Sequence, residues 1–256
     1  MKIDLLVFPQ KIFRFLIILV LTLSLLSITT QIILRFSENN ILLQAIAKIF
    51  YVDSEGNLPS LYSALSLLSC SILLAAIAFV KKFENKRYVN YWIGLSLIFL
   101  FLFWDESVQI HEKLLDTSLP TQILSLFGLE RQGVFTFSWI VVAIPLLMVF
   151  SLFYFKFFLS LSFRIKRLFL IAMFTFVGGA LGMEMVAGLI TDTDSLGYNS
   201  IPYVLSGAVE ELCEMMGIVV FIYALLLQLS QSSEKINVVF LNDTNNNKKE
   251  KKSINT

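Results

Sequence analysis

Six long apolar stretches, separated by shorter polar segments, dominate this sequence. Several of them reach the roughly 20 apolar residues that an α-helix needs to cross a bilayer. The pattern predicts six membrane-spanning helices, and we therefore expect an all-α, polytopic transmembrane bundle. The predicted spans cover about residues 13–34, 60–80, 88–111, 133–157, 168–191 and 204–228.

The segments outside these spans are short or polar. Residues 41–51 and 121–128 have an apolar face but are too short to span, so we expect them to lie at the membrane surface. The N-terminus resembles a signal peptide, but no small-residue cleavage site follows its apolar core, which favours a retained first span. Residues 231–256 are rich in Asn, Lys and Ser and predict a disordered polar tail. Residues 1–230 then form one transmembrane domain.

The charges of the loops predict the orientation of the chain. The loops at 81–87 and 156–167 are rich in Lys and Arg, whereas those at 36–59, 113–132 and 192–203 are mixed or acidic. The positive-inside rule assigns the two basic loops to the cytoplasm. Both termini are then expected to be cytoplasmic, and the protein is expected in a cell membrane.

The composition indicates the surroundings and the partners of the protein. Hydrophobic residues make up 57% of the chain and charged residues only 15%, which indicates the lipid bilayer as its surroundings. The net charge of +1 argues against a nucleic-acid partner, and the sequence identifies no protein partner. Cys70 and Cys213 both fall in apolar spans, where we expect them to act as small buried hydrophobes.

Seven carboxylates and the only histidine lie within or at the ends of three apolar stretches. Charges at membrane depth are costly and usually mark a function. With a rise of about 1.5 Å per residue, the acids of all three spans lie about 21–25 Å from the inner helix ends. That distance corresponds to the outer third of a hydrocarbon core roughly 30 Å thick, so we expect the three spans to be neighbours. The residues are Asp105, Glu106, His111, Glu112, Glu184, Glu210, Glu211 and Glu214.

Ionised carboxylates cannot crowd together unless some are protonated or cations neutralise them. An oxygen-rich site with one imidazole suits a divalent metal ion such as Mn²⁺, Fe²⁺, Ca²⁺ or Zn²⁺. We expect such a site, with two further acids as candidate catalytic proton carriers. The expected metal ligands are Asp105, His111, Glu112, Glu184, Glu210 and Glu214, and the candidate proton carriers are Glu106 and Glu211.

Three functions stay open from the sequence. The protein could be a metal-dependent enzyme on a membrane-soluble substrate, a cation or proton transporter, or a structural or assembly protein with a protonated acidic cluster. Residues 92–103 and 215–227 contain no acid or base, which argues against a polar transport route through the inner half. The acids near residues 105–112 could also lie at headgroup level.

The acidic motifs resemble those of a known group of proteins. Trp-Asp-Glu-x-x-x-x-His-Glu-Lys-Leu at 104–114, Gly-x-Glu at 182–184 and Glu-Glu-x-x-Glu at 210–214 are similar to motifs of uncharacterised bacterial multipass membrane proteins. The resemblance covers about residues 88–228 and implies that the acids act together, without implying an activity. The chain also resembles alkaline-ceramidase-like membrane hydrolases in its acids at helix ends, but it lacks their several histidines.

The predicted orientation can be tested by labelling single cysteines. In a chain whose native cysteines are replaced by serine, Glu84→Cys and Ser195→Cys should react from opposite sides of the membrane, because residue 84 lies in a basic loop and residue 195 does not. An impermeant thiol reagent applied to intact cells should label only residue 195. Equal labelling of both positions would overturn the orientation.

Overall fold

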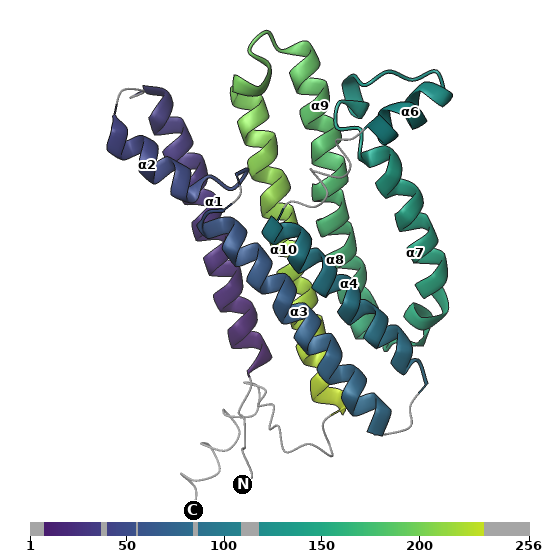
Figure 1. Cartoon of the computed structure of the whole chain (residues 1–256). Helices are drawn as coiled ribbons and strands as arrows, with labels where there is room; N and C mark the ends of the chain where they lie inside the picture. The colour runs from purple at the N-terminus through teal and green to yellow at the C-terminus, as the bar shows by residue number, and fades with distance from the viewer. Residues whose placement is uncertain (1–7, 37–39, 55, 84–86, 109–117, 233–256) are drawn as a thin grey trace, which may run out of the picture.

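The predicted apolar runs form helices in the computed structural model, which describes residues 8–36, 40–54, 56–83, 87–108 and 118–232. No strand occurs in these ranges. Six helical segments are long and apolar enough to cross a membrane, which confirms the expected all-α fold (Figure 1). They are α1 (Pro9–Phe36), α3 (Leu58–Phe83), α4 (Val89–Val108), α7 (Ile140–Ser160), the continuous segment Phe163–Thr193, and α10 (Ile201–Ser232).

The fifth segment is interrupted by a change of helix type. It begins as α8 (Phe163–Val177), continues as the π-helix η2 (Gly178–Met183) and ends as α9 (Glu184–Thr193). Short elements connect the long helices: α2 (Ile41–Phe50), α6 (Ser118–Leu126) and the 3₁₀ turns η1 (Gly133–Phe135) and η3 (Gly197–Asn199). Helices α2 and α6 coincide with the two short amphipathic segments of the sequence, although α6 begins at Ser118.

Two span boundaries differ from the prediction by five residues or more. Helix α7 begins at Ile140 rather than 133, because Gly133 has a φ of 60° and the chain turns through η1 first. Helix α8 begins at Phe163 rather than 168, so basic residues expected in a loop occupy its first two turns. Long basic side chains tolerate that position because their charged ends reach the headgroups. Helix α10 continues to Ser232, and the expected disordered tail lies otherwise outside the described residues.

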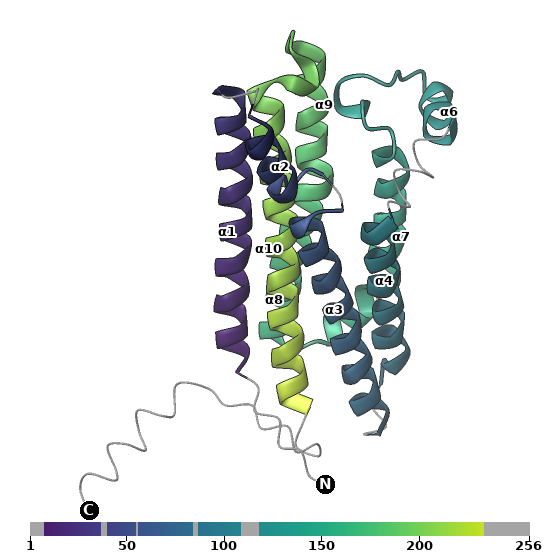
Figure 2. The ribbon, with the colours of Figure 1, turned by 60° about the vertical axis from the view of Figure 1, so that its left-hand side comes forward.

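Helix α10 is the central element of the bundle. It contacts α1, α3, α8, η2 and α9; it lies between α1 and α8 in Figure 1 and beside α1 in Figure 2. The start of α1 and the end of α10 lie at one end of the bundle, whereas α2 and α6 lie at the other (Figure 1). Val219, Ala224 and Leu225 of α10 are fully buried, so the C-terminal half of this helix lies largely in the core.

Two glycines allow α10 to approach the fifth segment closely. A Cβ atom on Gly217 would lie 2.8 Å from the backbone nitrogen of Phe176 and 2.9 Å from the carbonyl oxygen of Ala172. A Cβ atom on Gly179 would lie 2.9 Å from the carbonyl oxygen of Glu210. Small residues permit this kind of backbone contact between membrane helices. One glycine belongs to the fifth segment and the other to α10, so the two helices are in close contact at two positions along their length.

Helices α3 and α4 form an antiparallel pair joined by polar contacts. The hydroxyl of Ser71 donates to the carbonyl oxygen of Ser96 at 2.8 Å, and the hydroxyl of Ser96 donates back to the carbonyl oxygen of Ser71 at 2.9 Å. Such reciprocal hydrogen bonds satisfy hydroxyls that water does not reach. Helix α7 packs on α4 mainly through rings: Tyr91 stacks on Phe157 with centroids 5.5 Å apart.

The paired glycines of η2 offer a matched test of this packing. Gly179→Ala should destabilise the protein by about 1–3 kcal/mol, the usual effect of overpacking, because the new methyl group meets the α10 backbone. Gly178→Ala should have little effect, since nothing lies within 4 Å of its Cβ position and its backbone is helical. Thermal unfolding of the two detergent-solubilised variants measures the difference in their stability. Equal melting temperatures would contradict the close approach.

Candidate functional site

Glu184 occupies a position set by the π-helix. It is the first residue of α9, directly after η2. A π-helical turn holds more residues than an α-helical one, so η2 rotates α9 relative to α8 and determines the face on which Glu184 lies. The side chain is half-buried, and its Oε2 atom is buried. Single π-helical turns occur frequently at functional sites.

Glu210 and Glu211 are adjacent on α10, Glu214 follows about one turn later, and all three are half-buried. Positions 210 and 214 are four residues apart and therefore share one face of the helix. The backbone of Gly179 contacts this same turn: its Cβ position is 2.9 Å from the carbonyl oxygen of Glu210 and 3.3 Å from the amide nitrogen of Glu214. The start of η2 is thus packed against the part of α10 that carries the acids.

The carboxylates of three helices interact with one another. Glu210 interacts electrostatically with Glu184 and Glu211. Glu214 interacts with Glu210, with Glu184 and with Glu106, which lies in the last turn of α4. The structure therefore brings Glu106, Glu184, Glu210 and Glu214 together, and we refer to these four residues as the acid cluster. Asp105, which neighbours Glu106, is also half-buried.

The helices of the cluster carry no positive charge to balance it. The sequences of α4, α9 and α10 contain neither Lys nor Arg. Protons, bound cations or basic side chains of other segments can offset the mutual repulsion of neighbouring carboxylates. Within the described ranges, no group of three His, Cys, Asp or Glu residues has the arrangement of a metal site. His111 and Glu112, two of the expected ligands, lie outside the described residues.

Sequence reasoning missed two residues beside the cluster, Asp53 and Tyr203. Asp53 interacts electrostatically with both Glu210 and Tyr203, and Tyr203 interacts with Glu184. Asp53 belongs to the connection between α2 and α3, which the sequence analysis treated only as a loop of mixed charge. No hydropathy signal marks it, because its place depends on how that connection folds back onto α10.

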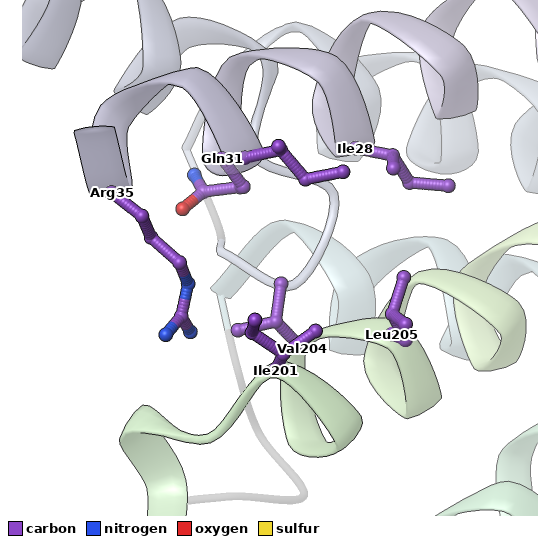
Figure 3. Close-up of a pocket in the computed structure, with 7 residues that line it drawn as sticks. Ile28, Gln31, Arg35, Ile201, Val204 and Leu205 are labelled. Atoms are coloured by element: carbon purple, nitrogen blue, oxygen red, sulfur yellow. The ribbon is translucent and has the colours of Figure 1, made fainter. Parts of the chain in front are cut away.

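A shallow apolar depression lies on a different side of α10. It is bordered by one basic and one amide side chain and otherwise by aliphatic ones, with no acid among them (Figure 3). It lies between the C-terminal half of α1 and the first turns of α10, and we do not assign it to the acid cluster. Its lining residues are Ile28, Gln31, Ile32, Arg35, Ile201, Val204 and Leu205.

The two cysteines are both free, as expected for small residues of the bundle. Cys70 is fully buried, and Cys213 is half-buried on α10. A Cβ atom on Gly179 would lie 2.8 Å from the Cβ atom of Cys213, so Cys213 forms part of the helix contact beside the acids.

Comparison with known proteins gives a family but no activity. A family model described as a domain of unknown function, DUF8692, matches residues 13–229, which include the four middle spans and most of the first and last. No curated protein matches the chain, and no solved structure does.

The meeting of α4 with α10 can be tested by cross-linking. In a chain without its native cysteines, the pair Glu106→Cys and Glu214→Cys should be joined by a short bifunctional thiol reagent, because the two carboxylates interact across the helices. The control pair is Leu97→Cys with Glu214→Cys, since Leu97 lies on α4 with 60% of its side chain exposed. Equal yields for both pairs, measured by intact mass, would contradict the cluster.

Proposed function

The chain belongs to the DUF8692 family, whose function is unknown, and we propose from the acid cluster that it is an integral membrane protein that binds a divalent cation. The observation that carries the proposal is the electrostatic interaction of Glu184 with both Glu210 and Glu214, on helices without Lys or Arg. A divalent cation offsets two negative charges at one point and accepts carboxylate oxygens as ligands.

The proposed ligands among the described residues are Glu184, Glu210 and Glu214, with Asp105 beside them. Because no three described residues have the arrangement of a metal site, the bound state requires side-chain movement or further ligands. His111 and Glu112 remain the predicted additional ligands. Glu106 and Glu211 remain the candidates for carrying protons, since an acid next to a ligand can exchange protons with a bound substrate.

An enzyme fits the arrangement better than a transporter. A transporter needs a second polar route on the other side of its binding site. Residues 92–103 of α4 and 215–227 of α10 contain no acid or base, and their inner portions are packed with aromatic side chains such as Phe99 stacked on Phe221 at 4.8 Å. The proposed activity is therefore a metal-assisted reaction on a membrane-soluble substrate.

A second candidate is a cluster that shares protons and has a structural role. The observation that favours it is the lack of a three-ligand arrangement among the described residues. Protons neutralise carboxylates one at a time and need no common centre. The two candidates differ in their response to metal ions.

Metal analysis and thermal unfolding of the purified protein test the proposal. The protein should contain stoichiometric divalent metal, and chelation should lower its melting temperature by about 5–10 °C, the effect of a ligand present at about 100 times its dissociation constant. Added Mn²⁺, Ca²⁺ or Zn²⁺ should restore it. Glu184→Gln should abolish this response, because it removes the carboxylate that interacts electrostatically with both Glu210 and Glu214.

Glu130→Gln serves as the matched control. Glu130 is an exposed acid of the connection before η1, and its replacement should leave the response to chelation unchanged. A protein without stoichiometric metal, whose melting ignores both chelator and added ions, would exclude the cation site and leave the proton-sharing cluster.

A further inference from the structure

Asp53 lies against α10 at Gly207, where an added side chain would crowd its carboxylate. A Cβ atom on Gly207 would lie 3.0 Å from the Cγ atom of Asp53 and 3.2 and 3.3 Å from its two carboxylate oxygens. The carboxylate therefore occupies the space that a side chain at position 207 would fill. Asp53, which belongs to the connection between α2 and α3, thus packs on the surface of α10.

The connection is held in this place by neighbouring contacts. The hydroxyl of Tyr51 donates to Oδ2 of Asp53 at 2.8 Å. Burial, and then the charge of Asp53, raise the pKa of Tyr51, so its hydroxyl keeps the proton that it donates. The backbone amide of Val52 donates to the hydroxyl of Ser27 on α1 at 3.1 Å, and the side chain of Val52 is buried.

Asp53 continues the line of acids along α10. Positions 203, 207, 210 and 214 follow one another at helical spacing on a single face of that helix. Asp53, which docks at position 207, interacts with Tyr203 and with Glu210, and Glu210 interacts with Glu184 and Glu214. Asp53 itself is exposed, whereas Glu210 and Glu214 are half-buried.

We propose that Asp53, docked at Gly207 and held by Tyr51, forms the entrance through which cations reach the acid cluster. An exposed carboxylate at the mouth of a site raises the local concentration of cations and lowers that of anions. The entrance lies in the connection between α2 and α3, and residues 215–227 of α10 contain no acid or base that would mark a second one. The use of the entrance by a divalent ion rests on the function proposed above, but the entrance can be tested without it.

The test measures how fast charged thiol reagents reach position 210. A chain with Glu210→Cys, and with Cys70 and Cys213 replaced by serine, is placed in nanodiscs of a neutral phospholipid, where both faces are open to reagent. A trimethylammonium methanethiosulfonate should react faster than its sulfonate analogue. Asp53→Asn should lower the ratio of the two rates about fivefold, because one charge within about 8 Å in watery surroundings acts with opposite sign on the two reagents.

Asp194→Asn is the matched control. Asp194 is a half-buried acid directly after α9, where it accepts a hydrogen bond from the amide of Leu196, and asparagine can keep that bond. Its replacement should leave the ratio unchanged. Tyr203→Cys is a second reporter on the same face of α10, for use where the change at position 210 prevents insertion.

The outcomes separate the two proposals. A ratio that falls with Asp53→Asn and not with Asp194→Asn supports the entrance, whether or not the purified protein holds metal. An unchanged ratio in Asp53→Asn, or an equal fall in both variants, overturns the entrance even if the metal analysis succeeds. A metal-free protein with a charge-selective entrance would retain Asp53 as the mouth of a proton-sharing cluster.

Discussion

The close contact between α10 and the fifth membrane segment is the constraint on which the rest of the arrangement depends. Gly179 and Gly217 lie on opposite helices, and each would meet backbone atoms of the other helix if it carried a side chain. When two helix backbones are this close, the positions of the glycines determine which turns face each other. The turn of α10 that Gly179 contacts is the turn that bears Glu210 and Glu214, and Glu184 follows Gly179 by little more than one helical turn. The packing of two small residues therefore decides which carboxylates meet.

Much of the fold could be predicted from the sequence, because a bilayer imposes a length and a polarity on every segment that crosses it. The number of spans and their centres follow from that requirement alone. The start of α7 could not be predicted in the same way, since Val134 and Phe135 are as apolar as the helix that follows and only the positive φ of Gly133 separates them. Hydropathy measures how apolar a segment is and does not report where its backbone turns.

The candidate site was only partly predictable for a related reason. Helical rise gives the height of an acid along its span, and equal heights suggested that α4, α9 and α10 are neighbours. Height does not reveal the direction in which a side chain points, so the partners of Glu106 and Glu184 emerge only from the packed bundle. Asp53 had no such signal, because it lies in a connection and joins the site through a gap left by Gly207. The pattern that identifies membrane helices contains no information about which loop folds over which helix.

The backbone hydrogen-bond pattern of the π-helical turn before Glu184 determines which acids lie together in the site. In η2 the backbone closes wider turns than in the α-helices on either side, which adds one residue within the same length of span. If this turn changed to α-helical geometry, α9 would rotate by about a quarter of a circle, the angle between neighbouring residues of a helix. Glu184 would then no longer lie on the side of α9 that faces Glu210 and Glu214. The residues of α9 that contact η1 would also shift against it. One backbone rearrangement would thus change both the number of carboxylates in the site and the packing of the connection above it.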